Sequence, residues 1–199
     1  MSQATGSKLN LPTRLIIGVI GVVAMVSGFR RCSTGLGEIS SAVDFEGVVT
    51  AMNAQVDSGN MAMFAAQPLL LTLVNDFNKL GLPAMRQQDT AQARKAHDLF
   101  GQSSAHFRNA AKLGGVAAGK DDRVTMKAIW PLELTSYNGL SDVEAINQHI
   151  AGLLRDESAL SAKALMDSVL SCARQRDSLQ LGAINAQAQA EAATAASKK

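Results

Sequence analysis

The residues from Gly114 to Lys120 have the spacing closest to a known chemical motif in this chain. They match the two glycines and the lysine of a phosphate-binding loop, in which backbone N–H groups hold phosphate oxygens. Asp121 follows, however, where such a loop needs a serine or threonine for magnesium, and its negative charge would repel phosphate. The preceding residues also predict a helix, whereas this loop normally follows a strand. We therefore interpret the segment as a flexible connection between helices and expect no nucleotide cofactor.

The three histidines do not form a metal-binding pattern. His97 and His106 are nine residues apart, so at about 100° per residue they point to opposite faces of one helix. His149 would have to meet one of them across helices. The chain also lacks the Glu-x-x-His, His-Glu-x-x-His and Gly-x-Ser-x-Gly signatures of di-iron, zinc-protease and hydrolase sites. We predict no metal, no cofactor and no catalytic residue, and therefore a protein that is not an enzyme.

The cysteines and the rarest aromatic residues each leave two interpretations open. Cys32 and Cys172 can form a disulfide if the domain is exported, or Cys172, on the apolar stripe of its predicted helix, is a buried free thiol. Trp130 and Tyr137 are the only residues of their types, and both fall in a predicted break before a long helix. They form a loop that faces a partner or ligand, as such residues do at interfaces, or Trp130 closes the end of the helical domain.

Composition argues against a nucleic-acid partner. The chain has 19 basic and 17 acidic residues, a net charge of +2 and only 4% aromatic residues. Four of the basic residues surround one apolar run near the start, so the remainder carries 15 basic and 17 acidic residues and is slightly acidic. Nucleic-acid binding needs clustered lysine and arginine, and no such cluster is present in the sequence.

That apolar run extends from Leu15 to Phe29, with Arg14 before it and Arg30 and Arg31 after it. Its 15 residues fall short of the roughly 17 to 20 that span a bilayer. Arginine stems can lie in the apolar layer, and the bilayer can thin around a short helix. We predict a single transmembrane anchor over residues 14–31, in contact with membrane lipid through 15–29.

Two alternatives to the anchor remain open, namely a cleaved signal peptide and a buried core helix. The length suits a signal peptide, but Ser27-Gly28-Phe29 lacks the Ala-x-Ala pattern of a cleavage site. Basic residues on the two sides of the run are nearly balanced, and the free amino terminus favours a cytoplasmic tail. We therefore expect a single-pass protein whose domain lies on the exported, periplasmic or extracellular side.

Four small residues within the run, Gly18, Gly21, Ala24 and Gly28, lie near one helical face. Small residues on one face let two membrane helices approach closely, so they are candidates for a dimer seam. The alternative is that glycine is simply frequent in membrane helices.

Apolar spacing predicts helices throughout the rest of the chain, and no strand pattern is present in the sequence. Residues 61–80 contain a second apolar stretch that suits a buried core helix, or else a segment that dips into the membrane. Helix ends are expected at four places: Ser58-Gly59-Asn60, Gly81 followed by Pro83, Gly114-Gly115 and Trp130-Pro131.

Ser141 and Glu144 match a capping box, in which a serine and a glutamate bond the first-turn N–H groups. We therefore expect a long helix from 141 to about 180 as the spine of the domain. The sequence as a whole predicts an all-α fold, with an N-terminal transmembrane helix and an antiparallel bundle of about four helices. The expected parts are a flexible polar tail (1–13), the anchor (14–31), the bundle (32–182) and a flexible Ala/Gln-rich tail (183–199).

The expected function is protein binding by a membrane-tethered, non-enzymatic domain of the cell envelope, as a structural, assembly or inhibitory component. Tethering would raise the effective concentration of the domain near its partner, and a second copy in a homodimer is one such partner. The alternative is an extracytoplasmic domain that senses a small molecule or envelope stress together with a partner. A further alternative is a membrane-active protein that contacts lipid through 61–80.

Overall fold

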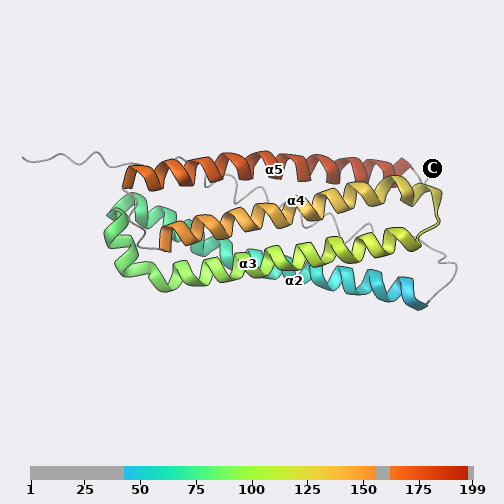
Figure 1. Ribbon diagram of the computed structural model, residues 1–199, viewed down its shortest axis with the longest axis horizontal. Coiled ribbons are helices and arrows are strands. Elements are labelled where there is room, and N and C mark those ends of the chain that lie inside the picture. Colours follow the sequence, from blue (N-terminus) through green and yellow to red (C-terminus); the bar gives the residue numbers. More distant parts are fainter. Residues whose placement is uncertain (1–42, 156–161, 197–199) are drawn as a thin grey trace, which may run out of the picture.

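The computed structural model describes residues 43–155 and 162–196, which are helical apart from short connections at residues 81 and 121–123. The helices are α2 (Val43–Leu80), α3 (Leu82–Lys120), α4 (Val124–Arg155) and α5 (Ala162–Ala196). They lie side by side and alternate in direction (Figure 1). The predicted all-α bundle of four helices is therefore confirmed for the described part of the chain, in which no strand occurs.

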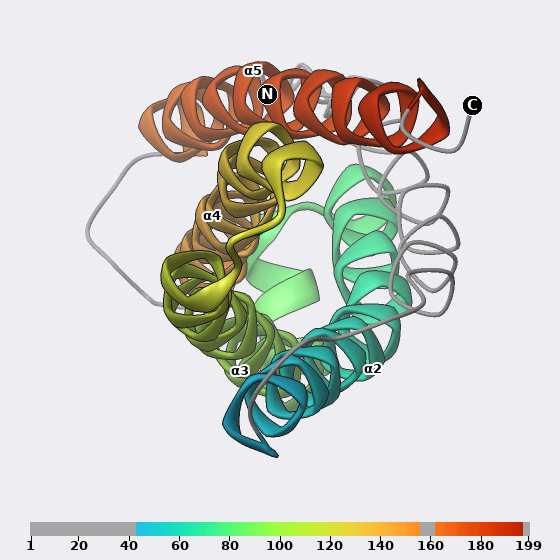
Figure 2. The same cartoon turned by 90° about the vertical axis from the view of Figure 1, so that its right-hand side faces the viewer.

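Each described helix packs mainly against its neighbours in the chain. α2 contacts α3, α3 contacts α4 and α4 contacts α5, whereas contact between α2 and α4 is slight. Seen along the bundle, the helices follow an arc in chain order from α2 to α5 (Figure 2). As a result, α3 and α4 are the central helices of the described part, and α2 and α5 are the outer ones.

The turn between α2 and α3 is the helix end that the sequence predicts correctly. Gly81 has a φ angle of +82°, which glycine adopts without the steric penalty of a side chain. Its N–H donates to the carbonyl of Phe77 at 3.0 Å and closes α2. α3 begins directly after Gly81, and its first turn contains Pro83. N–H groups in the first turn have no acceptor within the helix, so proline, which lacks an N–H, costs no hydrogen bond there.

The helix ends predicted at Gly59 and at Gly114 are wrong, because both glycines lie inside helices α2 and α3. Each occupies a place where a neighbouring side chain comes close. A Cβ on Gly59 would lie 3.2 Å from the ring of Phe107, and a Cβ on Gly114 would lie 2.9 Å from Cδ2 of Leu134. Close packing between helices therefore explains these glycines, at an intrinsic cost of about 1 kcal/mol each in helix propensity.

The end predicted at Trp130-Pro131 and the start predicted at Ser141 are also wrong, because α4 runs through both positions. Pro131 removes one backbone donor from α4, but its ring is exposed, and packing on α3 and α5 holds the helix together. The long helix expected over 141–180 is instead the second half of α4 and the first part of α5. Residues 183–196, predicted as part of a flexible tail, are helical and belong to α5.

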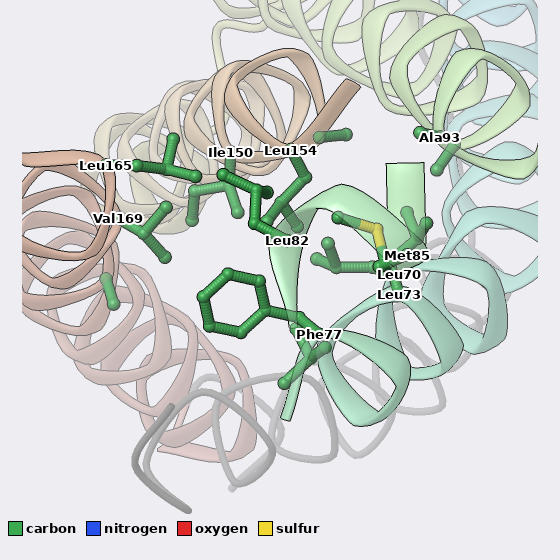
Figure 3. Packing of buried hydrophobic residues seen from close by; sticks show 14 of the residues in the cluster. Leu70, Leu73, Phe77, Leu82, Met85, Ala93, Ile150, Leu154, Leu165 and Val169 are labelled. Atoms are coloured by element: carbon green, nitrogen blue, oxygen red, sulfur yellow. The ribbon is translucent and has the colours of Figure 1, made fainter. Parts of the chain in front are cut away.

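Two clusters of buried hydrophobic side chains fill the bundle. The first takes residues from all four described helices, among them Phe77, Met85, Ile150 and Val169, and is shown in Figure 3. The second is built around Phe107 and includes residues of the same four helices nearer the other end of the bundle. Each buried leucine, isoleucine or phenylalanine contributes roughly 1.5–3 kcal/mol to stability, so these clusters supply most of the folding free energy.

Candidate functional site

A layer of buried polar residues separates the two hydrophobic clusters. On α3 it falls between Phe100 and Phe107, and on α4 it falls between Leu140 and Ile150. Polar groups in such a place destabilise a bundle unless they find hydrogen-bond partners. We define the polar layer as the buried residues Ser103, Ser104, Ser141, Glu144, Asn147, Arg176 and Gln180.

The serines of the polar layer connect helices directly. Ser103 Oγ donates to the carbonyl of Gly59 on α2 at 2.9 Å. Ser104 Oγ donates to the carbonyl of Ser141 at 2.8 Å, and Ser141 Oγ donates back to the carbonyl of Ser104 at 3.0 Å. Ser141 is therefore not the helix cap that the sequence predicts, since its hydroxyl bonds α3 to α4 in the middle of both helices.

Glu144 and Arg176 place ionisable groups inside the same layer. Glu144 is 0% exposed, and burial raises its pKa from 4.5 to about 8 despite opposing contributions from Asn147 and Arg176. The Asn147 amide lies 3.4 Å from Glu144 Oε2. Arg176 is 1% exposed and reaches outward to the Asp177 carboxylate, with Nη2 at 2.8 Å from Oδ1. At neutral pH, Glu144 is consequently a neutral carboxylic acid beside a buried guanidinium.

Several polar atoms in and beside this layer have no hydrogen-bond partner. They are Glu144 Oε1, Asn147 Oδ1, Arg176 Nη1, Asn60 Oδ1 and Ser136 Oγ. Each such atom costs roughly 1–3 kcal/mol if it stays unbonded. Together they offer both donors and acceptors to a small polar molecule, because a guanidinium donates, amide oxygens accept and a neutral carboxyl does either.

Sequence reasoning did not identify Glu144 and Arg176 as members of a buried site. The available signal was their position within apolar stripes. Glu144 is four residues from Leu140 and seven from Ala151, and Arg176 is three residues from Ala173. Charged residues at core spacing indicate either a helix end or a buried polar contact, and the capping-box pattern favoured the first.

Trp130 closes one end of the bundle and is 5% exposed. Its Nε1 donates to Asp121 Oδ2 at 2.9 Å, and Arg123 donates to both oxygens of the same carboxylate at 2.7 and 2.6 Å. The Arg123 guanidinium also lies 5.7 Å from the centre of the Phe45 ring at the start of α2. Although burial opposes ionisation, the bonds from Arg123 and Trp130 hold the pKa of Asp121 below its usual value.

Trp130 and Tyr137 lie in α4 and not in the loop that the sequence predicts. They are 5% and 3% exposed, so neither ring offers a surface to a partner in this conformation. Both belong to the second hydrophobic cluster. The structure thus corresponds to the interpretation in which Trp130 closes the end of the bundle.

The outer face of α2 exposes large apolar side chains on a segment of the helix that carries no charge. Residues 58–75 contain no aspartate, glutamate, lysine or arginine. Met61 is 73% exposed and Phe64 is 41% exposed, and Pro68 one turn further is exposed as well. Leu71 is half-buried on the same side. We call Met61, Phe64, Pro68 and Leu71 the α2 face.

The first acidic residue after this segment, Asp76, interacts with α3. It lies close to Asp89, which is 2% exposed, and burial together with the nearby Asp76 raises the pKa of Asp89. Gln92 Nε2 donates to Asp89 Oδ1 at 3.2 Å. Asp76 therefore belongs to the α2–α3 contact.

The remaining predicted residues of the described chain do not meet at one site. His106 Nδ1 lies 2.8 Å from Gln55 Oε1, whereas His97 Nδ1 lies 3.1 Å from Asp98 Oδ1. Within 43–155 and 162–196, no group of three or more His, Cys, Asp or Glu residues is placed to hold a metal ion. The 114–120 segment forms the last turns of α3 and not a loop. Cys172 is a half-buried free thiol, and burial raises its pKa.

Several predicted site residues lie outside the described residues. They are the anchor residues Arg14, Leu15, Phe29, Arg30 and Arg31, the seam residues Gly18, Gly21, Ala24 and Gly28, and Cys32. The four described helices include none with the length and hydropathy needed to cross a membrane. Comparison with known proteins finds no matching family model, no matching curated protein and no matching solved structure.

Proposed function

We propose that this chain is a membrane-tethered, non-enzymatic helical domain that binds protein through the α2 face, as a structural, assembly or inhibitory component of the cell envelope. The observation that carries the proposal is the exposure of Met61 and Phe64 on a helix segment without charge. Large apolar side chains gathered on one surface typically mark a site of contact with another protein or with lipid.

The spacing of the α2 face supports protein contact. Its four residues follow one another at intervals of 3, 4 and 3 residues, which is the spacing by which one helix presents a continuous stripe to another. The inward side of the same helix segment is occupied by Met63, Ala66 and Leu70, which are at most 1% exposed. Because the bundle interior already uses the inward residues, the outward stripe is available to a partner.

The tether in this proposal is the apolar run 15–29, flanked by arginines. An anchor there would hold the bundle at a membrane surface and would raise its effective concentration near a membrane-bound partner. Extraction of membranes with alkaline carbonate tests this part of the proposal. The proposal expects the full chain to stay with the bilayer fraction, and release into the supernatant would overturn the tether.

Affinity purification from detergent-solubilised membranes tests the binding part. The full chain is compared with Phe64→Ser, which shortens an exposed side chain of the α2 face, and with Val124→Ser as the matched control. Val124 is 82% exposed on α4, so its change removes a similar apolar area elsewhere. The proposal expects a protein that is lost with Phe64→Ser and retained with Val124→Ser. Identical recovery from all three samples would overturn it.

Lipid contact is the competing occupant of the same α2 face. Flotation of the domain with vesicles distinguishes the two, using a chain in which residues 15–29 have been made polar so that the anchor does not dominate. Flotation that depends on Phe64 would assign the face to lipid and overturn protein binding.

A second candidate function, sensing of a small molecule, is favoured by the unpartnered atoms of the polar layer. Glu144 Oε1, Asn147 Oδ1 and Arg176 Nη1 are buried and unbonded, so a small polar ligand could supply their missing hydrogen bonds. Screening small polar metabolites by thermal shift, with wild type and Glu144→Gln side by side, tests this candidate. A stabilising compound whose effect disappears in Glu144→Gln would support it.

A further inference from the structure

The charged residues at the two ends of the α2 face differ in sign. Asp57 precedes the uncharged segment 58–75, and Lys79 lies beyond it, near the end of α2. Both side chains are exposed. Asp57 is four residues before Met61, so it lies on the same side of the helix as the α2 face. Lys79 is 18 residues after Met61, a spacing of about five full turns that places it on that side.

An apolar stripe with opposite charges at its two ends is complementary to a copy of itself in the reverse direction. In an antiparallel pair of α2 helices with a two-fold axis at the level of residue 66, Met61 faces Leu71 of the second copy, and Phe64 faces Pro68 of the second copy. Lys79 then lies about 6 Å along the helix axis from Asp57 of the second copy, within reach of a lysine stem. A parallel in-register pair would instead place like charges together at both ends, which is unfavourable.

From this self-complementarity we infer that the partner of the α2 face is a second copy of this chain, bound by antiparallel pairing of α2 with α2. The inference rests on the proposed function, since it names the occupant of the same face. Two-fold symmetry uses each contact twice, so Phe64 and the Asp57–Lys79 pair each contribute two contacts to one interface. Asp76 does not oppose the pairing, because its carboxyl group interacts with Asp89 of α3.

Cysteine cross-linking of the full chain in detergent tests both the pairing and its direction, in a Cys32→Ser, Cys172→Ser background. Met61→Cys alone and Leu71→Cys alone are compared with the double variant Met61→Cys/Leu71→Cys under mild oxidation. In the antiparallel pair, residue 61 lies about 15 Å from residue 61 of the second copy, too far for a disulfide, which needs Cβ atoms roughly 4 Å apart. Only the double variant should form a covalent dimer.

Two results of this cross-linking would overturn the inference. Strong dimers from either single variant would indicate parallel pairing. No dimer from any of the three variants would indicate that the α2 face does not bind a second copy. If no dimer forms, the affinity purification decides whether the proposed function still holds. Recovery of a different protein with wild type, and its loss with Phe64→Ser, would leave the proposed function standing. If no such protein is recovered, both the proposed function and the pairing of two copies are overturned.

Sedimentation of the full chain in detergent measures the contributions of the side chains. Phe64→Ser should weaken the dimer by about tenfold or more, and the control Val124→Ser should leave it unchanged. Asp57→Lys and Lys79→Glu should each weaken it about threefold to tenfold, since each turns two attractive pairs into repulsive ones. The double variant Asp57→Lys/Lys79→Glu should recover the wild-type dimer. An equal loss with Val124→Ser, or no recovery in the double variant, would overturn the pairing.

Discussion

Glu144→Gln should stabilise the protein at neutral and alkaline pH and should change it little near pH 4.5. The substitution keeps the size of the side chain and its contact with Asn147, and it removes the ability to ionise. Glu144 is fully buried, and its pKa rises from 4.5 to about 8 in the folded state. At about 1.4 kcal/mol for each pKa unit, that change corresponds to at most about 5 kcal/mol of stability lost by wild type above pH 8.

The direction of this pH dependence follows from proton binding. Between pH 4.5 and about 8 the folded state keeps the Glu144 proton, whereas the unfolded chain has lost it. Because the folded state binds more protons in this window, the free energy of unfolding falls as pH rises through it. Glu133 contributes in the same direction up to about pH 7, since burial raises its pKa to about 7. The slope between pH 7 and 8 therefore reports mainly on Glu144.

Urea unfolding followed by circular dichroism at pH 5, 6, 7 and 8 measures these slopes. Wild type is compared with Glu144→Gln and with Glu46→Gln, a control at an exposed glutamate of α2. Wild type and Glu46→Gln should lose stability up to pH 8, whereas Glu144→Gln should be nearly flat between pH 7 and 8. A variant whose free energy of unfolding stays parallel to wild type over this range would refute the assignment of Glu144 as a neutral buried acid.

Three further predictions concern the packing of the bundle. Asp121→Asn should lower the free energy of unfolding by about 1–3 kcal/mol and shift the fluorescence of the single tryptophan. Asp122→Asn, which changes an exposed neighbour, should do neither. Equal losses of stability in the two variants would contradict the role of the Asp121 carboxylate at the bundle end. Gly139→Ala should lower the melting temperature, because the new Cβ would lie 2.9 Å from an α5 side chain. A Cβ at Gly182 would meet nothing within 4 Å, so Gly182→Ala should raise the free energy of unfolding by roughly 0.5–1 kcal/mol. Calorimetry measures both variants, and a Gly139→Ala protein more stable than Gly182→Ala would contradict this packing. Cys172 should react with maleimide more slowly in the folded protein than in urea, because burial raises its pKa; equal rates would show that the thiol is accessible.

Local sequence signals located one helix boundary correctly and failed at most others for a common reason. At Gly81, the left-handed backbone is a property of the glycine and its immediate neighbours, so the sequence contains the whole signal. At Gly59 and Gly114, the glycine accommodates a side chain from another helix. Nothing within a few residues of these glycines distinguishes a helix end from a close contact, because the contacting side chain is distant in the sequence.

The pattern at Ser141 and Glu144 shows the same limit for polar residues. A serine followed three residues later by a glutamate bonds the first turn of many helices, but here the serine bonds Ser104, which is 37 residues away. The apolar spacing was sufficient to predict an all-helical bundle, because burial depends on periodicity along one helix. The polar layer was not predictable, because it exists only where residues of several helices meet. The α2 face was visible as an apolar stretch, but its outward orientation required the fold.

The arrangement of the described helices in an arc, each against its neighbours in the chain, affects how the protein folds. Most contacts there join segments that are close in sequence, so few long loops must close before native contacts form, and such topologies fold rapidly. Among the described helices, α5 has one main neighbour, α4, whereas α3 and α4 each have two. Hydrogen exchange should therefore be faster in α5 than in α3 and α4, since α5 can separate from α4 by local unfolding while the first three helices remain packed.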